Sequence, residues 1–202
     1  MTEQQEPTRS GHDDDGDAVT REALAEARRQ IEVHARMVAD FPQPGIAFKD
    51  LTPVLADPSG LSSIVTALTH GCRDIGLVAG IDARGFLLGG AVACELGVGV
   101  LAVRKGGKLP PPVHSITYSL EYGTATLEIP ANGIDLSGQR VLVVDDVLAT
   151  GGTAVATADL LHQAGAEVVG VAVIMELDGL GGRATIAEGL GAALPVHAVT
   201  HG

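Results

Sequence analysis

The stretch that most constrains the fold is residues 141–154, VLVVDDVLATGGTA. Its first four residues form a short apolar, β-branched run, typical of a parallel strand buried on both faces. Asp145 and Asp146 come next, and a Thr/Gly turn then leads into a predicted helix. This order predicts an α/β sheet that binds its ligand at the carboxyl ends of its strands.

The turn suits a phosphate group. It consists of Ala149, Thr150, Gly151, Gly152 and Thr153. Hydroxyls, flexible glycines and the unpaired N–H groups of a helix start meet there, at the positive end of the helix dipole. The two aspartates carry the same sign of charge as a phosphate, so they suit sugar hydroxyls instead. The segment therefore predicts a site for ribose 5-phosphate.

The segment resembles the binding motif of the type I phosphoribosyltransferases: hydrophobic strand, Asp-Asp, a small residue and Thr-Gly-Gly-Thr. The resemblance implies phosphoribosyl pyrophosphate as donor, with Mg²⁺ held mainly through its pyrophosphate. The alternative is an ordinary strand–turn–helix with a chance acidic pair. No Walker A pattern occurs, and a G-x-G-x-x-A match at residues 97–102 runs from helix to strand, opposite to the dinucleotide-binding order.

The composition limits the partners of the chain. A formal net charge of −12 and an aromatic content of 2% argue against a general nucleic-acid or anionic-membrane binder. Arg104, Lys105 and Lys108 nevertheless crowd five positions. A local basic cluster of this kind can hold a pyrophosphate whatever the overall charge.

A second turn repeats the arrangement. The predicted strand 77–81 is followed by Asp82, Ala83, Arg84 and Gly85, where a helix begins. Backbone N–H groups could bind a second anion there, with Arg84 as a bidentate donor. The turn resembles the pyrophosphate loop of the family, which often carries a cis peptide at its small residue, although Ala83 replaces a common serine. The alternative is a surface arginine at a helix start.

Residues 104–123 are rich in glycine, proline and polar side chains. So long an irregular excursion predicts a mobile lid, closed by an extended arm over residues 124–129. At the start of the lid the glycines leave the backbone free, so that the three cations can follow a pyrophosphate leaving group. A solvated run of charges is the alternative.

Two further motifs narrow the resemblance. YSLEYG at residues 118–123 and FPQPGIAFKDLTPVL at residues 41–55 are similar to motifs of the branch of the family that uses adenine. With the two anion loops, the resemblance extends over roughly residues 41–176 in matching order. It implies transfer of a 5-phosphoribosyl group to adenine, which gives AMP and pyrophosphate in purine salvage.

The resemblance assigns roles within these motifs. Main-chain groups around Ala47 and Lys49 would hold the purine, with Phe48 in the apolar wall, and could distinguish a 6-amino from a 6-oxo group. Lys49 stands where many members have arginine, which weakens a bidentate contact. Glu121 would exchange a proton with the base, and Tyr122 would cover the anomeric carbon. From the residues alone, Glu121 equally suits a solvated surface position and Tyr122 a packing role.

The rest of the chain predicts one folded domain after a short leader. Residues 1–17 are polar and acidic, which predicts a disordered leader. Residues 18–202 would form the single domain, with an N-terminal helix over 18–39, a base-binding hood up to residue 56 that includes a loop at 46–56, and the lid excursion at 104–129.

Strands that alternate with helices predict an α/β fold, a mainly parallel twisted sheet flanked by helices. Cys72 and Cys94 show neither metal spacing nor a disulfide framework, which predicts a reducing cytoplasm. No signal-peptide pattern or membrane-length apolar run occurs, so a membrane partner is not expected. The resemblance also implies a homodimer.

The predicted catalytic residues are Glu121, Asp145, Asp146 and Arg84. The aspartates would contact ribose hydroxyls or Mg²⁺-bound water and stabilise positive charge on an oxocarbenium-like sugar. Two alternatives stay open: the same chemistry on another base, such as a 6-oxopurine or orotate, and a non-catalytic regulator of the same fold. A regulator of nucleic acid would need a basic face or an added helix pair, and neither is evident in the sequence.

Overall fold

The structure is a computed structural model that describes residues 13–40, 43–45, 47–119 and 123–202. It separates into two compact units, Met1–Ser63 and Ile64–Gly202. The predicted hood therefore falls in the first unit, and the two anion loops fall in the second. Among the described residues, no helix is long and apolar enough to cross a membrane.

The first helix differs from its prediction at both ends. α1 (Asp13–His34) begins five residues before the predicted start, and aspartates are favoured in the first turn of a helix as well as in polar leaders. It also ends before the predicted Ala39, because β1 (Arg36–Val38) pairs antiparallel with β2 (Phe48–Asp50). Helical periodicity is a local pattern, so it cannot predict that this segment pairs with β2, which lies further along the chain.

The predicted loop at 46–56 is partly regular. It contains β2 and the short helix α2 (Thr52–Ala56), which has a proline in its first turn. α3 (Pro58–Thr69) follows and continues past the boundary between the two units. In this part of the chain, strand pairing determined β2 and a proline in the first turn favoured α2, whereas hydrophobic periodicity predicted neither element.

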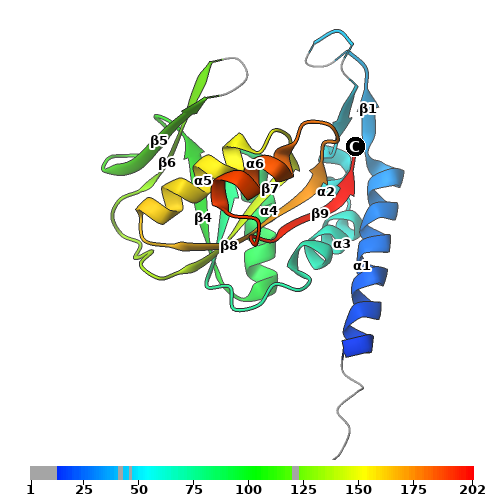
Figure 1. Cartoon of the computed structure of the whole chain (residues 1–202). Helices are drawn as coiled ribbons and strands as arrows, with labels where there is room; N and C mark the ends of the chain where they lie inside the picture. The colour runs from blue at the N-terminus through cyan, green and yellow to red at the C-terminus, as the bar shows by residue number, and fades with distance from the viewer. Residues whose placement is uncertain (1–12, 41–42, 46, 120–122) are drawn as a thin grey trace, which may run out of the picture. The chain divides into compact units, whose positions relative to one another are not determined.

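The second unit is built on a mainly parallel sheet, as predicted (Figure 1). Its seven strands lie in the order β5-β6-β4-β3-β7-β8-β9. The strands are β3 (Leu77–Ile81), β4 (Gly99–Lys105), β5 (Val113–Ser119), β6 (Thr124–Pro130), β7 (Arg140–Leu148), β8 (Glu167–Glu176) and β9 (Val196–His201). β4, β3, β7, β8 and β9 run parallel, whereas β6 is antiparallel to both β4 and β5.

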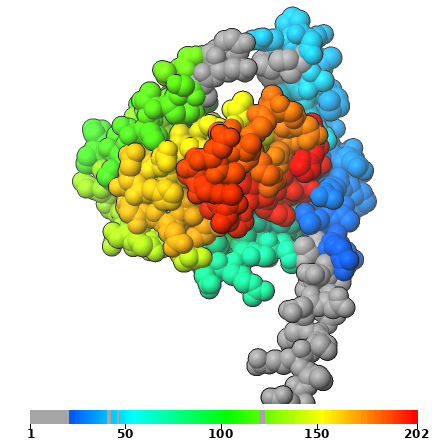
Figure 2. Space-filling model, viewed as in Figure 1, coloured from blue at the N-terminus to red at the C-terminus, as the bar shows by residue number. Residues whose placement is uncertain are grey.

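Helices cover both faces of this sheet. Successive strand residues point to opposite faces: Ala79 and Ile81 join the buried cluster that includes residues of α5 (Gly152–Gln163) and α6 (Gly182–Leu190), whereas Gly80 faces α4 (Arg84–Leu96). In Figure 2, α5 and α6 form the outer layer of the face turned toward the viewer. The sheet is thus buried on both sides, which explains the apolar strand sequences.

The lid excursion is also more regular than expected. β4 continues through Arg104 and Lys105, and Val113–Ser119 forms β5, paired along its length with β6. β6 matches the predicted extended arm. Figure 1 shows β5 and β6, in green, as a hairpin beside β4. Alternating residues of β5 are half-buried, so hairpin pairing and packing overrode the glycine- and proline-rich composition.

Two glycines allow α4 to start directly on the sheet. A Cβ on Gly80 would lie 2.3 Å from the carbonyl oxygen of Gly85, and one on Gly85 would lie 2.7 Å from that of Val144. Both distances are shorter than any real Cβ contact, and the neighbouring atoms are backbone. The first turn of α4 therefore lies against β3 and β7 at a separation that a methyl group would prevent.

This close approach predicts that Gly80→Ala destabilises the protein by about 1–3 kcal/mol, because the added methyl forces the backbone apart. Gly90→Ala is the matched control, since it lies in α4 and its Cβ would meet nothing within 4 Å. We expect this control to be neutral or to add up to about 1 kcal/mol through helix propensity. Urea denaturation measures both; equal effects of the two substitutions would contradict the packing argument.

Candidate active site

Two adjacent carboxylates lie near the carboxyl end of β7. The prediction placed them after the strand, but β7 extends to Leu148, because its pairing with β8 continues from Asp145 opposite Val173 to Leu148 opposite Glu176. Asp146 is buried, with 6% of its surface exposed. Its backbone N–H donates to Asp145 Oδ1 over 2.9 Å. The strand thus carries both carboxylates on a fixed backbone.

The two aspartates have different electrostatic environments. Asp146 accepts a hydrogen bond from Arg84 Nε and forms an ion pair with it. Burial, followed by the negative charge of Asp146, raises the pKa of Asp145 to about 8, and the backbone N–H of Asp146 and the charge of Arg84 offset this only partly. A cation or a hydroxyl donor placed beside Asp145 would therefore stabilise its ionised form.

The predicted phosphate turn directly precedes α5. Gly151 caps the helix with φ +85° and without a side-chain hydrogen bond, and the first bond of the helix runs from Val155 N–H to Gly151 O over 3.0 Å. The N–H groups of Gly152, Thr153 and Ala154 precede this bond, as the orphan donors of a helix start do. An anion would find both donors and the helix dipole here.

The turn lies beside the carboxylates. A small cavity of about 70 Å³ is lined by Asp145 together with Ala149, Thr150, Gly151 and Thr153. The structure therefore brings these predicted residues together.

A close glycine contact supports the phosphate turn from behind. A Cβ on Gly182, at the start of α6, would lie 2.2 Å from Ala149 O, and one on Gly151 would lie 2.5 Å from Gly182 O. The first turn of α6 thus fixes the backbone of the phosphate turn.

The second anion loop has the expected form. The Asp82–Ala83 peptide bond is cis, as the family resemblance implied, and Ala83 precedes the first residue of α4 without a side-chain cap. Arg84 contacts Asp146, so this loop meets the carboxylate pair. A Cβ on Gly85 would lie 3.2 Å from Asp145 Oδ1, which shows how closely the loop approaches β7.

The basic cluster lies where β4 ends. Arg104 Nε is 3.7 Å from Asp82 Oδ2, and its guanidinium lies 5.8 Å from the centre of the Phe86 ring. Lys105 N–H lies 3.5 Å from Asp82 Oδ2, and Arg104 Nη1 donates to Lys108 O over 3.3 Å. The pyrophosphate loop and the start of the lid are therefore neighbours, which fits the predicted shared role.

The other predicted site residues belong to the first unit or lie outside the described residues. Ala47, Phe48 and Lys49 belong to the first unit, where Phe48 and Lys49 pair with β1. Glu121 and Tyr122 lie outside the described residues. The base-binding and proton-transfer roles therefore stay predictions.

Three residues that contact predicted site residues were not themselves predicted. Gly182 contacts the phosphate turn, Phe86 lies under Arg104, and Tyr118 shares a 3.0 Å hydrogen bond with Thr153. Tyr118 stands within the YSLEYG motif and Phe86 directly follows the Asp82–Gly85 turn, so their position was the available signal. Gly182 carried none, because its role depends on a backbone contact with a distant turn.

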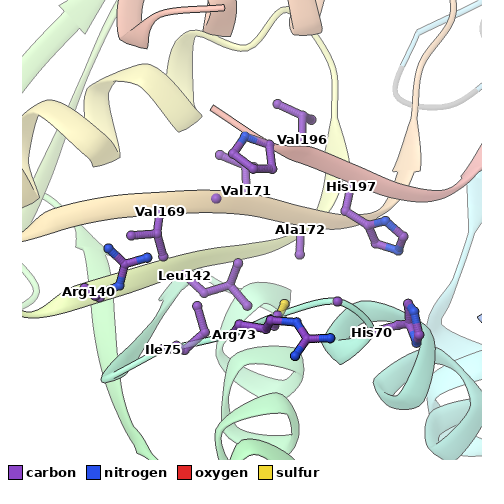
Figure 3. A pocket seen from close by; sticks show the side chains of 14 residues that line it. His70, Arg73, Ile75, Arg140, Leu142, Val169, Val171, Ala172, Val196 and His197 are labelled. Atoms are coloured by element: carbon purple, nitrogen blue, oxygen red, sulfur yellow. The ribbon is translucent and has the colours of Figure 1, made fainter. Parts of the chain in front are cut away.

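A larger cavity of about 410 Å³ opens near the amino ends of β7 and β9, away from the carboxylates. Figure 3 shows His70 and Arg73, from the segment after α3, below Leu142 and Ala172 of the sheet. None of the predicted site residues lines it. The size of a cavity therefore does not identify the candidate active site of this protein.

The described residues offer Mg²⁺ no protein cage, because none of their groups of three or more His, Cys, Asp or Glu side chains could hold a metal. Asp145 and Asp146 supply the hard oxygen atoms that Mg²⁺ prefers, and a cation would relieve the repulsion between them. The donor set thus fits an ion whose other ligands come from the substrate and water.

The mainly parallel sheet, with two helix-start loops beside the carboxylates of β7, belongs to the class of α/β proteins that bind their ligands at the carboxyl ends of strands. Residues 69–186 match the model of the phosphoribosyl transferase domain. An adenine phosphoribosyltransferase from Mycobacteroides abscessus is 66% identical over 152 residues, which cover 75% of this chain and 86% of that protein. The chain therefore belongs to the phosphoribosyltransferase family, among the adenine phosphoribosyltransferases.

Solved structures agree with this assignment. The adenine phosphoribosyltransferase of Rhodothermus marinus is 47% identical, covers 88% of this chain and 99% of its own, and superposes with a TM-score of 0.79. The enzyme of Saccharomyces cerevisiae, solved with adenine and an imino-altritol bisphosphate, is 33% identical, with 87% and 99% coverage and a TM-score of 0.75.

The raised pKa of Asp145 predicts a particular pH dependence of stability. Between its ordinary value of 3.8 and about 8 the folded protein retains a proton that the unfolded chain has released. This contribution to the free energy of unfolding is therefore complete below about pH 4 and falls as the pH rises toward 8. Asp145→Asn, which cannot ionise, should flatten that fall. Urea denaturation at several pH values compares the two proteins, and parallel pH profiles would contradict the assignment.

Proposed function

We propose that this chain transfers the 5-phosphoribosyl group of phosphoribosyl pyrophosphate to adenine, giving AMP and pyrophosphate. The observation that carries the proposal is the carboxylate pair of β7 between two helix-start anion loops. One loop is Ala149–Thr153, which we assign to the 5′-phosphate. The other, Asp82–Gly85, we assign to pyrophosphate together with Lys105 and Lys108. Two anion sites on either side of acidic, hydroxyl-binding groups suit this donor.

The carboxylates act on the sugar between these two ends. Asp145 and Asp146 hold ribose hydroxyls or Mg²⁺-bound water. The negative charge of Asp146, with that of Asp145 once a bound cation lowers its pKa, stabilises the positive charge that develops as the bond to pyrophosphate breaks. A Mg²⁺ ion bound with the donor would supply positive charge to the leaving pyrophosphate, and Asp145 and Asp146 would hold it through its water ligands. Arg84, which bonds Asp146, connects the carboxylates to the pyrophosphate loop, and Arg104 keeps the start of the lid beside Asp82.

The base is assigned to the first unit and to the lid. Ala47, Phe48 and Lys49 recognise adenine mainly through main-chain groups, which would leave buried polar atoms unpaired against a 6-oxopurine. Glu121 exchanges the proton of the base, and Tyr122 covers the anomeric carbon. Sequence motifs support these roles.

The expected assembly is a homodimer in the cytoplasm. Leu87 of α4 and Val100 of β4, 66% and 50% exposed, are apolar side chains that a second copy could cover. Cys72 and Cys94 are both free, in keeping with a reducing compartment. Sedimentation of the full chain tests the assembly, and a monomer at micromolar concentration would refute it.

Steady-state assays with phosphoribosyl pyrophosphate and Mg²⁺ test the base. We expect kcat/KM for adenine to exceed that for hypoxanthine, guanine or orotate by at least about 100-fold, because a mismatched base leaves buried polar groups unpaired. Negligible turnover of adenine would refute the proposal, and turnover of another base would identify the alternative.

If Glu121 transfers the proton of the base, its removal should lower turnover without weakening donor binding. Glu121→Ala should lower kcat by about 100-fold or more, because general acid–base catalysis contributes at least that much. Its effect on the Kd of the donor, measured by calorimetry, should stay within about twofold. Glu188→Ala, an exposed carboxylate of α6, serves as control and should change neither. Equal losses of turnover and binding would contradict proton transfer by Glu121.

A further inference from the structure

A tyrosine hydroxyl of β5 reaches the phosphate turn. Tyr118 Oη and Thr153 Oγ1 are 3.0 Å apart and share a hydrogen bond across 35 residues of sequence. A Cβ on Gly152 would lie 4.0 Å from the carbonyl oxygen of Ser119, so the backbone of β5 reaches the same turn. β5 thus approaches the start of α5 at two neighbouring points.

Hydrogen-bond chemistry makes this contact directional. A hydroxyl has one proton to donate and two lone pairs that accept. If Tyr118 donates to Thr153, the threonine proton is left for another acceptor, whereas the reverse arrangement occupies it. A phosphate offers only acceptor atoms to the turn, so a bound phosphate selects the arrangement in which Tyr118 donates.

The ring of Tyr118 fixes the position of its hydroxyl. The side chain is half-buried and packs against the hydrophobic cluster between the sheet and α5. Because packing against this cluster limits the rotation of the ring, the hydroxyl is presented to Thr153 from a constant direction. A flexible polar side chain in the same place would lose more conformational entropy on forming the contact.

We propose that Tyr118 is a positioning residue of the donor site, whose hydroxyl orients the Thr153 hydroxyl toward the 5′-phosphate. The inference rests on the proposed assignment of Ala149–Thr153 to that phosphate. Tyr118 acts through Thr153 and does not touch the reacting atoms. Its effect is therefore confined to ligands that carry a 5′-phosphate, and pyrophosphate, assigned to Asp82–Gly85, is bound independently of it.

Calorimetric titration of Tyr118→Phe tests this directly. The substitution keeps the ring and removes the hydroxyl, so the Kd of ribose 5-phosphate should rise about fivefold, as expected for loss of the neutral hydrogen bond that orients Thr153. The Kd of Mg²⁺-pyrophosphate should stay within about twofold, which also shows that the variant is folded. In steady state, KM for phosphoribosyl pyrophosphate should rise with little change in kcat. Equal weakening of both ligands would overturn the inference.

Two further variants separate the possible failures. Thr153→Val should weaken ribose 5-phosphate, and adding Tyr118→Phe to it should weaken binding no further, because both act through one hydroxyl. If the protein does not bind ribose 5-phosphate, the phosphate assignment itself fails; if it binds and Thr153→Val has no effect, or Thr153→Val weakens binding and Tyr118→Phe does not, the assignment stands and the role of Tyr118 fails. Thr117→Val is the matched control, since it breaks the 2.9 Å hydroxyl pair with Thr126 on the same hairpin, and binding should be unchanged.

Discussion

The site depends on backbone contacts that only glycine permits. Gly80 and Gly85 let the first turn of α4 lie against β3 and β7, and Gly151 and Gly182 let α6 lie against the phosphate turn. Each anion loop is therefore fixed by a neighbouring element that touches its main chain. Helix-start N–H groups bind an anion well only when their directions are set beforehand. These glycine pairs set them through main-chain contacts alone.

Much of this arrangement could be predicted from local pattern. The apolar run before Asp145, the glycine turn after it and the similar loop at Asp82–Gly85 each combine a buried strand with a helix start, so sequence order is enough to place them at the same edge of a parallel sheet. The parallel sheet and its flanking helices are confirmed, and the structure brings both loops to the carboxylates.

The remaining features depend on partners distant in sequence. α1 ends where β1 pairs with β2, and β7 extends past Asp146 because β8 continues to pair with it. The contacts of Gly182 and Tyr118 likewise join segments that periodicity treats separately. No local pattern predicts these element ends and contacts, because tertiary pairing overrides intrinsic propensity at these positions.

The buried carboxylate pair also makes the stability of the protein depend on the concentration of its substrate. In the empty protein, burial and the charge of Asp146 keep Asp145 protonated at neutral pH at a cost in stability, and a cation or donor molecule bound at the proposed site would offset that cost. Occupied molecules are therefore harder to unfold than empty ones. Because proteases act on unfolded chains, donor scarcity would shorten the lifetime of the enzyme as well as slow its reaction.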